Sequence, residues 1–231
     1  MPATVVITGA GRGIGAELCR QALAAGDTVI ACPRTADTPD LDANTRARVR
    51  VVPMDVADEG SIASATAAIE GMAGGVDLLV NNAGVYPRET VAFDRLDPEA
   101  LVQAFRVNAL GPLRVTASLL PLLRRGREKR VAALTSKMGS IDDNRSGGSY
   151  GYRLSKAALN MAVRNLAHEL GREGFVVVAI HPGWVRTRMG GGDRAPLALD
   201  AAAAEVLRLA RTADISLSGA MLGPGGERIA W

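Results

Sequence analysis

Tyr152 and Lys156 lie four residues apart in a stretch with helical spacing, so their side chains share one face of a predicted helix. An isolated tyrosine phenol has a pKa of about 10, too high for proton exchange near neutral pH, and a nearby ammonium lowers that pKa. Tyr150, the neighbouring phenol, has Leu154 four residues further on instead of a lysine. The pair predicts a proton-transfer site at Tyr152, although the same spacing also arises by chance on amphipathic helices.

A second set of residues with a chemical spacing follows the apolar run at residues 4–8. Glycines there let the backbone turn tightly and approach a pyrophosphate, whose charge meets the free N–H groups and the dipole of the next helix. The spacing is G-x-x-x-G-x-G and not the common G-x-G-x-x-G. We predict a dinucleotide-binding turn, with an ordinary tight turn as the alternative, made of Gly9, Gly11, Arg12, Gly13, Ile14 and Gly15.

The elements that must position these two sets are apolar β-branched runs separated by longer stretches with helical spacing. The pattern predicts one domain over residues 1–231, a Rossmann-type doubly wound parallel α/β sheet of about seven strands with helices on both faces. Expected strands are 4–8, 28–31, 49–53, 76–81, 130–135, 175–181 and 220–222. Expected helices are 13–25, 61–71, 98–123, 152–170 and 200–211, with Pro112 and Pro121 kinking or shortening the longest one.

Composition narrows the classes of function. No apolar run approaches the roughly 20 residues of a membrane-spanning helix, and the two cysteines, Cys19 and Cys32, are expected to be buried without forming a disulfide. The short basic cluster at residues 124–130 lacks aromatic side chains and fits a solvated surface turn, so we expect no nucleic acid or membrane partner. We also expect no metal and, because the chain starts directly with a strand, a cytoplasmic location.

The glycine spacing is similar to that of the short-chain dehydrogenase/reductase family, and further motifs match in order. Asp55 and Val56 follow the third strand, where the resemblance implies contacts with adenine, although Asp55 can also be a cap. The turn Asn81-Asn82-Ala83-Gly84 follows the fourth strand; its implied roles are to steady the sheet and to lie against the cofactor, and an ordinary Asn-rich turn is the alternative. After the sixth strand, the implied nicotinamide contacts are Pro182, Gly183, Val185 and Thr187.

The resemblance also implies that Ser136 and Asn108 act with Tyr152 and Lys156. Ser136 would hold the substrate oxygen, Lys156 would bond the nicotinamide ribose, and Asn108 would anchor a water leading from Lys156 to solvent. The implied reaction is hydride transfer between the nicotinamide and a carbonyl or alcohol carbon, with Tyr152 as the general acid/base. Alternatively, Asn108 fills a helix kink and Ser136 caps a turn; the rival hydroxyls are Thr135 and Ser140.

The choice of dinucleotide depends on the segment after the second strand. No acidic residue stands at the strand tip, and Arg34 with Arg12 can clamp a 2′-phosphate through planar donors. We therefore expect NADP, and with it reduction of the substrate. If both arginines are solvated and Asp37 folds back onto the ribose, NAD is the cofactor instead.

The gap between Ser136 and Tyr152 is longer than is usual in the family. Here the chain resembles a branch with C-factor and sniffer-type carbonyl reductases, through G-S-I at residues 139–141 and G-G-x-Y-x-Y-R-x-S-K at residues 147–156. The expected substrate is a ketone or aldehyde in a largely apolar pocket, below a flexible loop at residues 189–192 and lined by Val85, Tyr86, Met138, Tyr150, Trp184 and Met189. Family resemblance implies a homodimer or homotetramer. The alternatives are a dinucleotide-sensing signalling protein of the same fold and an NAD-dependent alcohol dehydrogenase.

Overall fold

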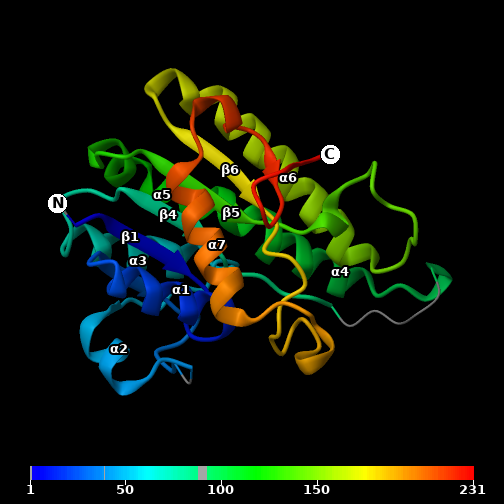
Figure 1. Ribbon diagram of the computed structural model, residues 1–231, viewed down its shortest axis with the longest axis horizontal. Helices are drawn as coiled ribbons and strands as arrows, with labels where there is room; N and C mark the ends of the chain where they lie inside the picture. Colours follow the sequence, from blue (N-terminus) through cyan, green and yellow to red (C-terminus); the bar gives the residue numbers. More distant parts are fainter. Residues whose placement is uncertain (1, 39, 88–92) are drawn as a thin grey trace.

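The computed structural model describes residues 2–38, 40–87 and 93–231, and its strands form one sheet (Figure 1). The order is β3-β2-β1-β4-β5-β6-β7-β8, with the first seven strands parallel and β8 antiparallel to β7. The strands are β1 (Thr4–Thr8), β2 (Thr28–Cys32), β3 (Arg50–Val51), β4 (Leu78–Asn81), β5 (Arg130–Leu134), β6 (Val176–Ile180), β7 (Met221–Leu222) and β8 (Arg228–Ile229). The predicted α/β class is confirmed, and the strand order reverses between β1 and β4, where doubly wound sheets bind their ligands.

Two apolar layers cover the sheet because successive strand side chains point to opposite faces. In β1, Val5 and Ile7 pack on the side of α1 and α7, whereas Val6 packs on the side of α3, α5 and α6. Figure 1 shows α1 and α7 lying together over one face. The helices are α1 (Gly13–Ala24), α2 (Ala43–Arg48), α3 (Glu59–Glu70), α4 (Pro98–Phe105), α5 (Gly111–Arg125), α6 (Tyr150–Leu170) and α7 (Leu199–Thr212).

The helix expected over residues 98–123 is irregular just before Pro112, one of the two prolines predicted to kink or shorten it. A π-helical turn, η2 (Arg106–Leu110), separates α4 from α5, and the Gly111 N–H donates to the Arg106 carbonyl. Pro112 has no N–H to offer the carbonyl of Asn108 four residues earlier, which favours a widened turn at this point. Pro121 lies inside α5 without ending it. The widened turn holds Asn108, so the irregularity falls on a predicted site residue.

Three smaller elements also differ from the prediction. The third strand is reduced to Arg50–Val51, although the N–H groups of Val52 and Met54 still donate to the carbonyls of Ala31 and Pro33, at 2.9 and 2.7 Å. α2 was not expected; it is six residues long, and the Asp42 carboxylate caps it by accepting the Thr45 N–H at 2.9 Å. β8, also unexpected, adds an eighth edge strand of two residues, which is too short for an alternating pattern to be recognised.

None of the helices within residues 2–38, 40–87 and 93–231 is both long and apolar enough to cross a membrane. The same residues contain no group of three or more His, Cys, Asp and Glu side chains arranged to hold a metal ion.

Candidate active site

The predicted proton-transfer pair lies at the beginning of α6, directly after a tight backbone turn. Gly147, Gly148 and Ser149 have consecutive positive φ angles of 62°, 66° and 47°, a conformation that glycine adopts without steric cost. The Ser149 hydroxyl bonds the hydroxyl of Tyr86 at 2.7 Å, and the Tyr86 ring lies 4.7 Å, centroid to centroid, from the ring of Tyr152. These contacts fix where α6 starts and therefore where Tyr152 points.

The Tyr152 phenol is held in its neutral form in this structure. Burial raises the pKa of Tyr152 to about 12, and a hydrogen bond with the Ser136 side chain opposes that rise. The charge of an ionised Tyr86 also raises the pKa of Tyr152, because two neighbouring phenolates repel each other. The expected lowering of this pKa by Lys156 is not found, because removal of the phenol from water outweighs the hydrogen bond that favours its ionised form.

Lys156 is buried beneath the same ring. Its Nζ donates to the Leu134 carbonyl at 2.7 Å and lies 5.8 Å from the centroid of the Tyr152 ring. Burial lowers the pKa of Lys156 to about 8, because the charged ammonium is removed from water. Near neutral pH this lysine is therefore a cation that can give up its proton more readily than a solvated one.

Asn108 connects the widened turn of η2 to both neighbouring segments. Its Oδ1 accepts the Val85 N–H at 2.8 Å, and its Nδ2 donates to the Val85 carbonyl and to the Ser155 hydroxyl, each at 2.9 Å. A Cβ on Gly84 would lie 3.3 Å from Oδ1 of Asn108 and 3.8 Å from Nζ of Lys156. The predicted turn residue Gly84 thus lies where these two polar side chains approach each other.

The structure separates Ser136 from its two rival hydroxyls. Thr135 donates to the buried side-chain oxygen of Asn160, and the Ser140 hydroxyl accepts the N–H of Asp143 at 3.0 Å. Ser136 follows β5 and is the hydroxyl that bonds the Tyr152 side chain. It also accepts the N–H of Met138, so the predicted turn-capping role holds as well.

The glycine turn follows β1 and leads into α1. Gly9 and Gly13 have positive φ angles of 63° and 53°, and a Cβ on Gly15 would lie 2.3 Å from the Gly9 carbonyl oxygen. The N–H groups of Ile14 and Gly15 donate to no acceptor among the described residues, and Arg12 gives α1 no side-chain cap. Unpaired N–H groups at a helix start attract phosphate, so the turn fits a dinucleotide.

The Asn-rich turn after β4 is locked to the glycine turn. Asn82 donates its side-chain amide to the carbonyls of Thr8 and Gly9, at 2.8 and 3.2 Å. The Thr8 hydroxyl accepts the N–H groups of Asn82 and Ala83, each at 3.0 Å. The turn therefore steadies adjacent strands, as predicted. Thr8 has this role without having been singled out from the sequence, and its place directly before Gly9 was the available signal.

The segment after β6 reaches the same glycine turn from the other side. Gly183 has a φ of 83°, and Val185 is buried, while the methyl group of Thr187 lies 3.7 Å from where a Cβ on Gly13 would be. Pro182 is half-buried at the start of the segment. The residues predicted to contact the pyrophosphate and those predicted to contact the nicotinamide therefore lie on neighbouring segments.

His181, directly before Pro182, has a neutral side chain. Burial lowers its pKa to about 4, and its Nδ1 has no hydrogen-bond partner among the described residues. It therefore does not compete with Tyr152 as a proton donor at neutral pH.

The adenine end contrasts with these buried groups. Val56 is buried, and the Asp55 carboxylate accepts the N–H of Ala57 at 2.9 Å, which closes a local turn. The N-cap of α3 is Asp58 and not Asp55, so the capping alternative is wrong. Arg12 and Arg34 are exposed, and neither guanidinium has a hydrogen-bond or ionic partner in the described parts of the chain. Asp37 is also exposed.

The comparisons with known proteins agree with this geometry. Residues 3–197 match the family model described as short chain dehydrogenase. The chain belongs to the short-chain dehydrogenase/reductase family. A curated relative, C-signal of Myxococcus xanthus, is 55% identical over 120 residues, which cover 52% of this chain and 72% of that protein.

Solved structures of this family extend the likeness to the complete chain. The NADPH-bound carbonyl reductase from chicken fatty liver is 30% identical with a TM-score of 0.88, and the carbonyl reductase Sniffer of D. melanogaster is 26% identical with a TM-score of 0.91. Both comparisons cover 100% of each chain. The predicted resemblance to the C-factor and sniffer branch is confirmed, and the chain is an oxidoreductase that acts on CH–OH or C=O groups with a nicotinamide dinucleotide.

The residues predicted to line the substrate pocket of this short-chain dehydrogenase differ in burial. Val85 and Met138 are half-buried beside Asn108 and Ser136, respectively. Tyr150, Trp184 and Met189 are 40%, 56% and 51% exposed, and the indole N–H of Trp184 donates to the Gly190 carbonyl at 2.6 Å. Val85 and Met138 are therefore part of the hydrogen-bonded site. Tyr150, Trp184 and Met189 are exposed, and their place in the substrate pocket stays a prediction.

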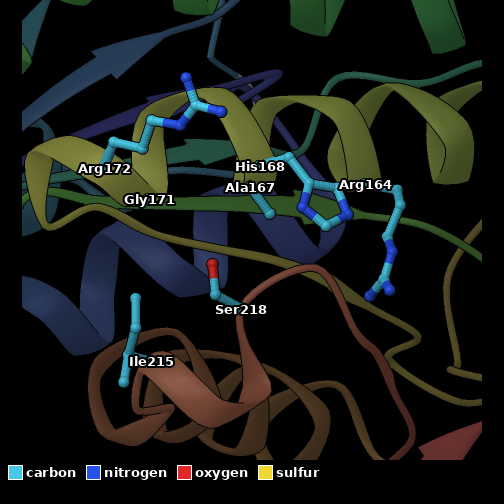
Figure 2. A pocket seen from close by; sticks show the side chains of 7 residues that line it. All are labelled: Arg164, Ala167, His168, Gly171, Arg172, Ile215 and Ser218. Carbon is cyan, nitrogen blue, oxygen red and sulfur yellow. The ribbon is translucent and has the colours of Figure 1, made fainter.

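A separate cavity of about 330 Å³ lies at the far end of α6 (Figure 2). His168 lies sixteen positions after Tyr152, which places this cavity about 24 Å along the helix from the candidate active site. Figure 2 shows the Ser218 hydroxyl pointing toward the helix, opposite His168. None of the predicted site residues lines this cavity, whose lining is Arg164, Ala167, His168, Gly171, Arg172, Ile215 and Ser218.

Proposed function

We propose that the protein is an NADPH-dependent reductase of ketones or aldehydes with Tyr152 as its proton donor. The observation that carries this proposal is the convergence of the buried Ser136 and Lys156 side chains on the half-buried Tyr152 phenol. Burial keeps Tyr152 protonated, with a pKa of about 12, which is the state that a proton donor needs. A general acid placed in this way contributes about 10²–10⁴-fold to a rate.

The proposed steps follow from the positions of the chain's own groups. Ser136 donates to the substrate oxygen and holds it beside the Tyr152 hydroxyl. When bound, the reduced nicotinamide supplies hydride to the carbonyl carbon. Tyr152 gives its proton to the oxygen, which completes the alcohol and leaves a phenolate. Lys156 stabilises this phenolate by its charge and, because burial has lowered its pKa to about 8, can return a proton to it.

Preference for NADPH rests on the two exposed arginines at the adenine end. Arg12 and Arg34 have planar, forked donors and no partner among the described residues, so both can turn toward a 2′-phosphate. The chicken reductase that resembles this chain is itself NADPH-bound. Glycine-turn N–H groups would hold the pyrophosphate, and the segment from Pro182 to Thr187 would face the nicotinamide. A homodimer or homotetramer and a cytoplasmic location remain predictions.

The proposal is tested by following NADPH and NADH oxidation against a panel of ketones and aldehydes. Tyr152→Phe is run beside the wild type. Tyr150→Phe is the matched control, because it removes an exposed phenolic hydroxyl that has no lysine four residues further on and keeps the ring predicted to line the substrate pocket. We expect turnover with NADPH that is lost in Tyr152→Phe and kept in Tyr150→Phe. Preference for NADH would overturn the cofactor choice. Tight dinucleotide binding without turnover of any carbonyl would instead favour the sensing role.

A further inference from the structure

One backbone donor of the glycine turn is already occupied by an acidic side chain. The N–H of Gly13, the first residue of α1, donates to Oδ2 of Asp40 at 2.8 Å. The backbone of the same segment lies on the turn as well, since the Asp40 N–H donates to the Gly11 carbonyl at 3.4 Å. A carboxylate from the segment after β2 thus reaches the place where the turn is suited to accept phosphate.

The surrounding charges give this carboxylate no other described partner. Asp40 is exposed and forms no ion pair with a described residue, although Arg12 and Arg34 belong to the same end of the molecule. A negative group at a helix N-terminus is stabilised by the dipole and by the unpaired N–H groups. The Asp40 carboxylate therefore uses part of the attraction that the turn would otherwise offer to an incoming anion.

We propose that Asp40 is a built-in competitor for the phosphate-binding turn, and this inference rests on the proposed dinucleotide-binding function. In the free protein its carboxylate stabilises the first turn of α1. For the cofactor's phosphates to approach Gly13, the Asp40 side chain must release that N–H and avoid a like charge. Dinucleotide affinity is then lower than the turn alone would give, and the free protein is more stable in exchange.

The test is fluorescence titration of NADPH and NADH into Asp40→Asn and Asp40→Ala. An asparagine can still accept the Gly13 N–H but lacks the charge, so we expect the dissociation constant to fall about threefold. Alanine removes the acceptor as well, and we expect a fall of about tenfold. Both dinucleotides should bind more tightly to the variants, since both carry the pyrophosphate that the turn binds.

Glu99→Gln is the matched control, because it removes an equal charge from an exposed residue of α4, outside the predicted cofactor site. Its carboxylate has no partner among the described residues, and we expect the NADPH dissociation constant to change by less than about twofold. Equal gains in the Glu99 and Asp40 variants would overturn the proposal, since they would reflect net charge alone. A gain limited to NADPH would also overturn it, because it would place Asp40 against the 2′-phosphate instead of the turn.

Thermal unfolding gives a readout that does not depend on turnover. Asp40→Ala should melt below the wild type without cofactor, and the difference should shrink or reverse when NADPH is saturating. An unchanged or weakened affinity in the Asp40 variants, with normal binding by the wild type, refutes this inference and leaves the proposed function standing. Failure of the wild type to bind either dinucleotide overturns both.

Discussion

The catalytic end and the adenine end of the candidate site are built in opposite ways. Around Tyr152, the polar groups are buried and bonded to the protein itself: Lys156 to the Leu134 carbonyl, and Asn108 to Val85. At the adenine end, Arg12 and Arg34 are exposed and have no partner in the described residues. The first set is positioned before any ligand arrives, whereas the second is positioned only when one binds.

This difference separates chemistry from selectivity. A proton donor must be held within hydrogen-bond reach of the substrate oxygen, so its surroundings are fixed and carry a cost in folding stability. Cofactor choice needs only charges that can reach a phosphate, and surface charges can be exchanged with little effect on the fold. Substitutions in the two regions should therefore change different measured quantities.

The largest effect is expected for Tyr152→Phe. Loss of the phenolic proton should lower the rate of NADPH oxidation by about 10³-fold, while the dissociation constant for NADPH stays within about twofold. Single-turnover fluorescence and equilibrium titration measure these two quantities. A rate within about tenfold of the wild type would mean that another group donates the proton.

Ser136→Ala should have the second-largest effect. It should lower the rate of NADPH oxidation by about 10²-fold, because the donor to the substrate oxygen is removed. Thr135→Val tests the neighbouring hydroxyl: it leaves the buried Asn160 oxygen without its donor and should cost about 1–3 kcal/mol of unfolding free energy with the rate preserved. Urea unfolding and steady-state kinetics on both variants distinguish the roles. The reverse pattern would make Thr135 the catalytic hydroxyl.

Lys156→Met should stabilise the free protein by about 2 kcal/mol at pH 7, since it removes about 3 kcal/mol of charge-burial cost and loses about 1 kcal/mol of hydrogen bonding to the Leu134 carbonyl. Burial lowers the Lys156 pKa from 10.5 to about 8, so below pH 8 the folded wild type bears the full cost of a buried charge. Between pH 8 and about 10.4 the unfolded lysine binds a proton that the folded one lacks, so wild-type stability rises with pH.

The stabilisation by Lys156→Met should therefore shrink between pH 8 and pH 10, as measured by urea unfolding at several pH values. Lys137→Met is the control, because Lys137 is a solvated lysine paired with Asp143 at 3.1 Å. An advantage for Lys156→Met that is constant with pH would show that its origin is packing and not the buried charge.

The smallest effect is expected for Arg34→Ala. The dissociation constant for NADPH should rise about tenfold and that for NADH should stay unchanged, with no change in melting temperature, because the guanidinium is exposed. Raising the salt concentration should weaken NADPH binding to the wild type more than to the variant. Equal losses for both dinucleotides would place Arg34 away from the 2′-phosphate.

How much of this could be predicted from the sequence differs between the two ends. The glycine turn and the Tyr152–Lys156 pair are encoded by local spacing, so their elements were predictable. The direction of the Tyr152 pKa was not, because burial against Tyr86 and Ser136 depends on segments far apart in the chain. Asp40 on Gly13 was also missed, since no pattern marks a loop carboxylate that folds back across 27 residues.

The central claim is that catalysis and cofactor selectivity are carried by two independent regions. Its most direct test is a double-mutant cycle between Tyr152→Phe and Arg34→Ala. Each protein is measured for its NADPH oxidation rate at saturation and for its NADPH dissociation constant. We predict that Tyr152→Phe changes only the rate, Arg34→Ala changes only the dissociation constant, and the double variant shows the sum of the two free-energy changes. A coupling above about 0.5 kcal/mol in either quantity would contradict the account, because the two ends would then act as one unit.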